Sequence, residues 1–309
     1  MLSLEGMYSL PELSRMVTQH TGKSVKQLTG IRPGVWYAQL GAGTYVLKVR
    51  KHRAHLVDEQ QVLKALGTFG VPVERLLHIW PIDADRALCL YAHVDGAPLT
   101  LDAALSRAAD LGRSIGILHR GLATVVGKTD RRVGKLPETL IYSVVPALAQ
   151  TGSLLLIALK EQLLANEAAL WDLQGLPRQL IHRDAHIGNM LFRDDTFGGW
   201  VDFDLLETNF RIFDVCYCAA GLLAARFTDA AWRNEWFPAV RTMVQAYSEV
   251  VGLVPAEVEA VWMMMVAIEA LFVGIGAQRD PRMAERTAAI CLWLFEQRHR
   301  WRPYAVEGQ

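Results

Sequence analysis

Three separated polar residues, Asp184, Asn189 and Asp202, lie within residues 180–204, where short apolar segments follow a strand-turn-strand pattern. The pattern predicts a short strand over 190–192, a turn, and a returning strand over 200–203. Such a hairpin would bring Asn189 and Asp202 close together, and neighbouring oxygen ligands suit Mg²⁺, which is usually shared with substrate phosphates. Asp184 would then lie where it can accept a proton from a hydroxyl nucleophile.

The order of these residues resembles the catalytic loop of a kinase, H-R-D-x-x-x-x-N followed by a metal-binding D-F-x. Here residues 182–184 read H-R-D, Asn189 follows, and residues 202–204 read D-F-D. His186 gives the loop the form D-x-H-x-x-N, which is similar to the aminoglycoside phosphotransferase, homoserine kinase and choline kinase group. A polar hairpin that matches by chance is the alternative, but two motifs in order and at this spacing favour the resemblance.

The resemblance implies a reaction in which the γ-phosphoryl group of ATP passes to a hydroxyl. Asp184 would be the catalytic base or orienting group, and Asn189 and Asp202 would hold Mg²⁺. Asp204 stands where protein kinases have a glycine, and it is expected to help hold a second metal ion. Whether it does so is left open by the sequence.

Lys48 lies inside an apolar strand predicted over 44–49, and a lysine in that position needs a charged partner. An amphipathic helix predicted over 58–66 carries Glu59, eleven residues after Lys48. By resemblance, Lys48 holds the α- and β-phosphates and Glu59 is its ion-pair partner. Asp58 is the alternative partner, and a solvated helix face is the other interpretation.

Two further nucleotide contacts are implied by chain order. Residues 30–34, Gly-Ile-Arg-Pro-Gly, stand where a kinase has its phosphate-covering loop, so Gly30 and Gly34 are candidates, although Pro33 removes a backbone N–H and an ordinary turn is the alternative. The strand predicted over 86–94 would be the hinge, whose backbone near Ala92 and Val94 would bond the adenine edge.

The part after the hinge has the pattern of a helical domain. Asp214 follows Asp202 by only twelve positions, which leaves no room for the segment that docks peptides in protein kinases. By resemblance to the family, Asp214 is expected to brace the catalytic loop. His119 is expected to be structural. Met263 and its neighbours could line a pocket but fit a packed core better.

Composition excludes several classes of function. Apolar residues make up 51% of the 309 residues, and Lys plus Arg equals Asp plus Glu at 32 each, so a polyanionic partner is not expected. The four cysteines have no zinc spacing. The first residues do not resemble a secretory signal, and the apolar tract over 261–276 is short for a bilayer span, so a cytoplasmic protein is predicted.

The resemblance, together with the order of strands and helices, thus implies an α+β, two-lobed protein-kinase-like fold, with a nucleotide-binding N-lobe over 1–95 and a mainly helical C-lobe over 96–309. The predicted function is an ATP- and Mg²⁺-dependent phosphotransferase acting on a small hydroxylated metabolite, with no nucleic-acid or membrane partner. The C-terminal helices have balanced charge, so a polycationic acceptor is not indicated. An atypical protein kinase and a nucleotide-binding module without turnover are the alternatives. The sequence pattern does not identify the acceptor, the choice between ATP and GTP, or the oligomeric state.

Overall fold

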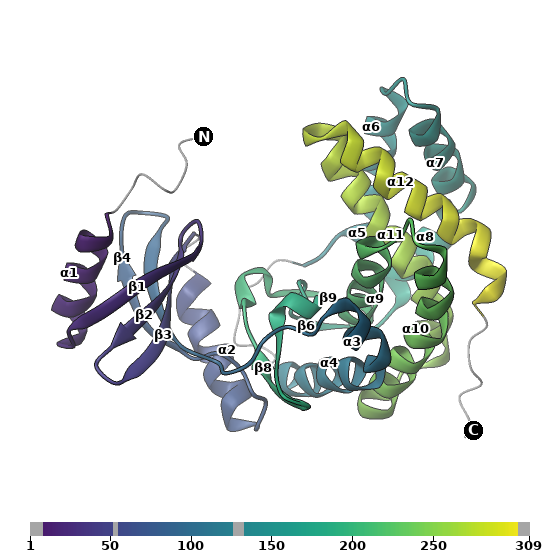
Figure 1. Ribbon diagram of the computed structural model, residues 1–309. Coiled ribbons are helices and arrows are strands. Elements are labelled where there is room, and N and C mark those ends of the chain that lie inside the picture. The colour runs from purple at the N-terminus through teal and green to yellow at the C-terminus, as the bar shows by residue number, and fades with distance from the viewer. Residues whose placement is uncertain (1–8, 52–54, 126–132, 302–309) are drawn as a thin grey trace. The chain divides into compact units, whose positions relative to one another are not determined.

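The computed structural model describes residues 9–51, 55–125 and 133–301 (Figure 1). The chain divides into two compact units, of which the first contains residues 1–97 and 191–202. The second contains residues 98–190 and 203–309. The division after residue 97 falls close to the expected boundary, but the hairpin assigned to the C-lobe groups with the first unit. The N-terminal residues considered as a signal sequence lie outside the described part.

An antiparallel sheet of five strands, in the order β1-β2-β3-β5-β4, forms the centre of the first unit. Its strands are β1 (Val25–Arg32), β2 (Val35–Leu40), β3 (Gly43–Arg50), β4 (Leu76–Pro81) and β5 (Ala87–Ala92). The turn between β2 and β3 uses Gly41 at φ 60°, an angle that glycine adopts without steric cost. Helix α2 (Leu56–Thr68) follows β3 in the chain.

Helix α1 (Leu10–Thr21) covers apolar side chains of the sheet. The helix begins after Ser9, whose side chain accepts from the Glu12 backbone N–H while the Glu12 carboxylate accepts from the Ser9 backbone N–H. Leu13 and Val17, one turn apart, are fully buried in a cluster with side chains of β2, β3, β4 and β5. The small sheet therefore has a core of its own.

A second, two-stranded hairpin completes the first unit, built from β7 (Met190–Arg193) and β8 (Thr196–Trp200). Its turn is shorter than the one predicted over 193–199, and its second strand ends at Trp200. Trp200 forms a parallel bridge with Val73, and Phe192 pairs with Ala97. These backbone bonds attach the hairpin to the segment after α2 and to the end of the hinge region.

Helices dominate the second unit, as the sequence pattern predicts. The longer ones are α3 (Leu101–Ser106), α4 (Ala108–Ala123), α7 (Leu154–Ala165), α8 (Glu167–Asp172), α9 (Phe213–Ala225), α10 (Ala230–Val251), α11 (Pro255–Arg279) and α12 (Pro281–Glu296). The shorter pieces are α5 (Leu136–Thr139), a π-helical turn (Leu140–Val144), α6 (Val145–Ala149) and the 3₁₀ turns Leu173–Gly175, Ile187–Asn189, Phe203–Leu205 and Gln297–Arg300. A two-stranded antiparallel sheet joins β6 (Arg178–Ile181) to β9 (Glu207–Phe210).

Helices α4 and α10 cross at very short range because α4 presents glycines at the contact. A Cβ added to Gly112 would stand 2.0 Å from the Met243 carbonyl oxygen, and one added to Gly116 would stand 2.7 Å from Cβ of Val250. Only a residue without a side chain fits such a crossing. The crossing matters for the site because α4 carries His119.

Helix α11 is long and apolar enough, by length and composition alone, to span a membrane. Most of its apolar stretch is nevertheless buried against neighbouring helices, which is typical of the central helix of a folded domain. Met263, Met264 and Met265 are all buried in this packing. The interpretation of these methionines as core residues is therefore confirmed.

Candidate functional site

Lys48 is held in the first unit by a buried acidic partner. Strand β3 places its side chain in the interior, where Nζ lies 3.0 and 3.2 Å from the two carboxylate oxygens of Glu74. The same ammonium is 3.5 Å from Oδ1 of Asp202 and 4.6 Å from the centre of the Tyr91 ring. A buried ammonium requires such compensation, because an unpaired charge in the interior is costly.

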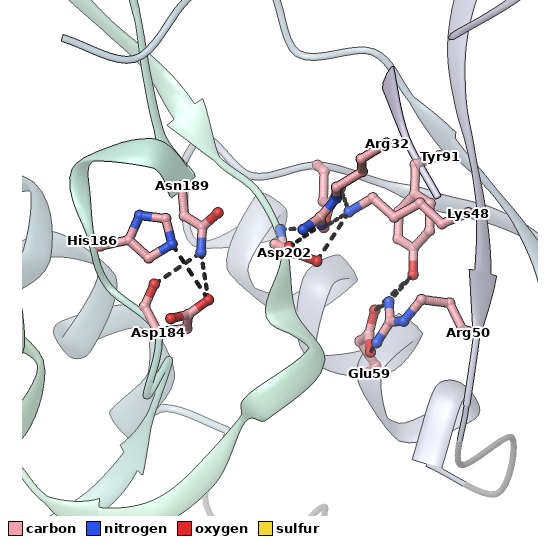
Figure 2. A network of polar contacts seen from close by, with 10 residues as sticks. Arg32, Lys48, Arg50, Glu59, Tyr91, Asp184, His186, Asn189 and Asp202 are labelled. Atoms are coloured by element: carbon pink, nitrogen blue, oxygen red, sulfur yellow. Dashed lines mark hydrogen bonds and ion pairs between the residues drawn. The ribbon is translucent and has the colours of Figure 1, made fainter. Parts of the chain in front are cut away.

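The prediction that Glu59 pairs with Lys48 is wrong in this structure. Glu59 instead binds Arg50, with Nη1–Oε1 and Nη2–Oε2 distances of 3.0 and 2.8 Å, and accepts a hydrogen bond from the Tyr91 hydroxyl at 3.0 Å (Figure 2). Lys48 and Arg50 are two positions apart on β3, so their side chains point to the same face of the sheet. Arg50 meets the first turn of α2, and Glu74, after the helix, reaches Lys48.

Asp202 follows the hairpin with its backbone in the left-handed region, at φ 69°. Its backbone N–H donates to Oε1 of Glu74 at 2.7 Å. Its Oδ2 accepts from Nη2 of Arg32 at 2.7 Å (Figure 2). Its carboxylate thus lies between the Arg32 guanidinium and the Lys48 ammonium. An unusual backbone angle at a polar residue often accompanies function, because surrounding contacts must maintain it.

Glu74 and Arg32 were not identified from the sequence. Their contacts bridge 128 and 170 residues of chain, so no local spacing indicates them. A signal was present for Glu74, since it follows the apolar stretch 71–73 and an acid at the end of such a stretch needs a partner when buried. Arg32 precedes the turn residue Pro33 and has no comparable signal, because its side chain is 60% exposed.

The predicted phosphate-covering loop over 30–34 is a tight turn. Strand β1 continues through Gly30 to Arg32, which pairs with Val35, so only Pro33 and Gly34 form the connection. Gly34 has φ 78°, the angle that glycine supplies after proline in a type II turn. Gly30 therefore lies in a strand and not in the connection. Contact of Gly30 and Gly34 with a nucleotide stays a prediction.

The predicted adenine contacts at the end of β5 have different surroundings. The N–H of Ala92 already donates to the carbonyl of Arg75 at 2.9 Å, so this amide is engaged within the first unit. Val94 lies two positions beyond the last residue of β5 and is outside any strand. A hinge contact through the Ala92 N–H therefore conflicts with the structure, while Val94 stays a prediction.

The second unit holds Asp184 by hydrogen bonds from both sides. Nδ2 of Asn189 donates to Oδ2 of Asp184 at 3.0 Å and to its backbone carbonyl at 2.9 Å (Figure 2). The Tyr217 hydroxyl, from α9, donates to Oδ1 at 2.8 Å. Nδ1 of His186 accepts from the Gly188 N–H at 2.9 Å, so the ring carries its proton on Nε2, which lies 3.6 Å from Oδ2 of Asp184.

These contacts set the protonation state of Asp184. Burial by itself raises the pKa of this carboxyl, but the interactions with His186 and Tyr217 outweigh it, so the pKa lies below its ordinary value of 3.8. Asp184 is therefore ionised at neutral pH. The burial of Tyr217 and the charge of Asp184 raise the pKa of the tyrosine, so its hydroxyl stays protonated and acts as a donor.

Asp214 braces the loop that carries Asp184, as predicted. Its carboxylate is fully buried and accepts from the backbone N–H groups of His182 and Arg183, both at 2.8 Å. These bonds stabilise Arg183 at φ 68°, the turn that leads into Asp184. His119 is structural, because its ring binds Asp214 through Nε2 at 2.9 Å and the Tyr247 hydroxyl through Nδ1 at 2.7 Å.

The donor atoms of the predicted metal ligands suit Mg²⁺. In the second unit, Asn189 uses its amide nitrogen on Asp184, so its oxygen is the atom directed to other ligands. In the first unit, Asp202 is a carboxylate beside two cations. Within the described ranges, three or more His, Cys, Asp or Glu side chains do not gather as a metal-binding group, so phosphate or water oxygens would complete the coordination.

Asp204, the candidate ligand of a second metal ion, is exposed in the 3₁₀ turn Phe203–Leu205. It belongs to the second unit, whereas Asp202 belongs to the first. Its role as a ligand stays a prediction.

Comparison with known proteins identifies relatives of the chain. A family model described as "Phosphotransferase enzyme family" matches residues 24–259. A homoserine kinase of Beijerinckia indica subsp. indica is 29% identical over 112 residues, which are 36% of this chain and 35% of the homoserine kinase. The match thus spans about a third of that relative's length.

Solved structures resemble the chain over nearly its whole length. The GDP complex of wild-type aminoglycoside 2′-phosphotransferase-IIIa has a TM-score of 0.67 at 16% identity and covers 96% of this chain and all of its own. A microcompartment-associated aminopropanol kinase has 0.66 at 17%, covering 92% and 97%. The amicoumacin kinase hAmiN, in complex with AMP-PNP, Ca²⁺ and Ami, has 0.63 at 17%, covering 94% of each chain. These likenesses confirm the predicted α+β, protein-kinase-like fold.

Proposed function

Because the chain belongs to the phosphotransferase enzyme family, we propose that it transfers the γ-phosphoryl group of ATP to a hydroxyl group of a small molecule. One observation carries the proposal. Asp184 is an ionised carboxylate whose two oxygens are oriented by Asn189 and Tyr217. A group that accepts a proton from a bound hydroxyl needs such a fixed orientation.

In the proposed reaction, the acceptor hydroxyl oxygen forms a bond to the γ-phosphorus while the bond between that phosphorus and the β,γ-bridging oxygen breaks. The hydroxyl proton passes to Asp184, and the products are the phosphorylated acceptor and ADP. Asp184 contributes by orienting the hydroxyl and by taking its proton as negative charge leaves the oxygen. Its low pKa suits a loose transition state, in which proton removal is late and orientation matters most.

The first unit is proposed as the nucleotide-binding part. Lys48, held by Glu74, would contact the α- and β-phosphates, and Arg32 offers a second, exposed cation near Asp202. The oxygens of Asn189 and Asp202 would hold Mg²⁺, which when bound neutralises charge on the phosphate oxygens. Relatives of the same fold were solved with GDP or with AMP-PNP and Ca²⁺, which supports a nucleotide and a divalent cation.

A small acceptor is proposed rather than a protein. Between Asp202 and Asp214 the chain forms only a 3₁₀ turn and strand β9 before helix α9 begins, which gives a peptide no docking segment. The relatives are named for homoserine, aminopropanol, an aminoglycoside and amicoumacin, all of them small molecules. We propose a cytoplasmic enzyme whose acceptor is a small metabolite of low or mixed charge.

The test is a transfer assay with γ-labelled ATP, and in parallel γ-labelled GTP, in the presence of Mg²⁺. Acceptors are offered singly: homoserine, choline, methylthioribose, simple sugars, aminoglycosides and generic protein substrates. Label on one or more small molecules, absent when the Asp184→Asn variant is used, is the expected result. Label on proteins and on none of the small molecules would favour a protein kinase, and bound nucleotide without any transfer would favour a binding module.

A further inference from the structure

Tyr217, whose hydroxyl contacts Asp184, is itself held in place by its neighbours. It lies in α9, three residues after the bracing Asp214, and its half-buried ring packs between two others. The Phe213 ring is stacked on it at 5.9 Å between centroids and 16° between planes, and the Phe272 ring of α11 lies at 6.0 Å. The ring is therefore fixed by two helices, and its hydroxyl is carried to a defined point.

That point is Oδ1 of Asp184, which the hydroxyl reaches at 2.8 Å. The other oxygen, Oδ2, takes its hydrogen bond from Asn189 at 3.0 Å. Donors on both oxygens prevent the carboxylate from rotating about its Cβ–Cγ bond. An ionised carboxylate has about four acceptor positions, so lone pairs remain for an acceptor hydroxyl beside these two donors.

We propose that Tyr217 is a positioning residue for phosphoryl transfer, which fixes the carboxylate of Asp184 so that a free lone pair is directed at the acceptor hydroxyl. The inference rests on the proposed function. It assigns Tyr217 no proton transfer, since the phenol remains a donor throughout. Orientation is a large part of what an enzyme contributes to phosphoryl transfer, because the protein takes little part in bond making.

The neighbours of the pair show why the tyrosine hydroxyl matters. His182 and His186, on the loop of Asp184, also interact with its carboxylate, but Nε2 of His186 stands at 3.6 Å, beyond hydrogen-bonding distance. Tyr217 in turn faces the charges of Asp214 and Arg183. Among the contacts described for Oδ1, the phenol is the one at hydrogen-bonding distance.

Tyr217→Phe tests the proposal because it keeps the ring between Phe213 and Phe272 and removes only the hydroxyl. With a confirmed acceptor, we expect kcat to fall about tenfold, as for the loss of one hydrogen bond to a charged group. The KM for ATP should stay within about twofold, since the nucleotide does not depend on this contact. Tyr142→Phe, at a side chain that is 69% exposed, is the matched control and should keep the parent kcat.

A readout without turnover separates this inference from the proposed function. Protein labelled with 13C at the tyrosine Cζ position contains eight such carbons, and the resonance missing from Tyr217→Phe identifies Tyr217. Replacing Asp184 by Asn should shift that resonance and leave the Tyr142 resonance in place. A parent-like kcat in Tyr217→Phe, or an unshifted Tyr217 resonance in Asp184→Asn, would overturn the positioning role. If no acceptor is found, the resonance alone decides.

Discussion

Glu74→Gln tests the ion pairs around Lys48 in the first unit, because it changes the charge of one partner and little else. Glutamine keeps the shape and an oxygen for the Asp202 N–H, but it removes the negative charge 3.0 Å from the buried ammonium of Lys48. Breaking a buried ion pair costs about 3 to 5 kcal/mol. Because Asp202 still lies 3.5 Å from the same ammonium, we expect a loss of about 2 to 3 kcal/mol in the free energy of unfolding.

Glu59→Gln is the matched control, since Glu59 is as deeply buried and also binds a cation, Arg50. This substitution should lower the free energy of unfolding by a similar amount, but Glu74 still pairs with Lys48. Denaturant unfolding gives the stabilities, and calorimetric titration with Mg²⁺ and a non-hydrolysable ATP analogue gives the affinities. We expect affinity to fall about tenfold, or 1.4 kcal/mol, in Glu74→Gln and less than about threefold in Glu59→Gln.

The reverse pattern would refute the reasoning. If Glu59→Gln lost nucleotide affinity and Glu74→Gln kept it, Glu59 would be the residue that orients Lys48 when nucleotide is bound. Equal affinities in both variants and the parent would mean that Lys48 does not depend on either acid for phosphate binding.

Three further results are expected. Burial raises the pKa of Glu269 to about 8, so between pH 4.5 and 8 the unfolded chain releases a proton that the folded chain keeps. The free energy of unfolding should therefore fall by about 1 kcal/mol per pH unit in this range. Glu269→Gln should flatten this slope in denaturant titrations. Gly112→Ala should cost about 3 kcal/mol or more, because its methyl would overlap the Met243 carbonyl, whereas Gly221→Ala, with open space around it, should stabilise α9 by up to about 1 kcal/mol. Asp202→Ala should weaken the Mg²⁺ dependence of thermal stabilisation by an ATP analogue, and an unchanged dependence would exclude Asp202 as a ligand.

Local patterns predicted most of the secondary structure. The cap at Ser9 and the glycine turn at Gly41 each depend on residues within a few positions, and both are present. The pairing of Asp184 with Asn189 was predictable for the same reason, because five residues of one loop separate them. The fold class was predicted from the family resemblance of residues 182–214 and from the order of strands and helices along the chain.

Contacts between distant parts of the chain were not predictable in this way. The sequence pattern predicts Glu59, in the first turn of the following helix, as the partner of Lys48. Arg50, two positions after Lys48 on β3, points to the same side and binds Glu59 instead. Glu74, which follows the helix in the chain, pairs with Lys48. This choice of partner depends on the folded sheet and not on local spacing. The contact of Tyr217 with Asp184 was not predictable either, because the two residues are 33 positions apart in the chain. The apolar pattern of the helix that carries Tyr217 does not indicate this hydrogen bond.

The central claim is that Asp184 receives the acceptor hydroxyl and does not bind the nucleotide, and one comparison tests it most directly. Turnover with a confirmed acceptor and Mg-ATP affinity are measured for the parent and for Asp184→Asn, which keeps the size of the side chain. We expect kcat to fall by about 10²-fold or more, while the affinity for Mg-ATP changes by less than about threefold. Parent-like turnover in Asp184→Asn, or a loss confined to nucleotide affinity, would contradict the account.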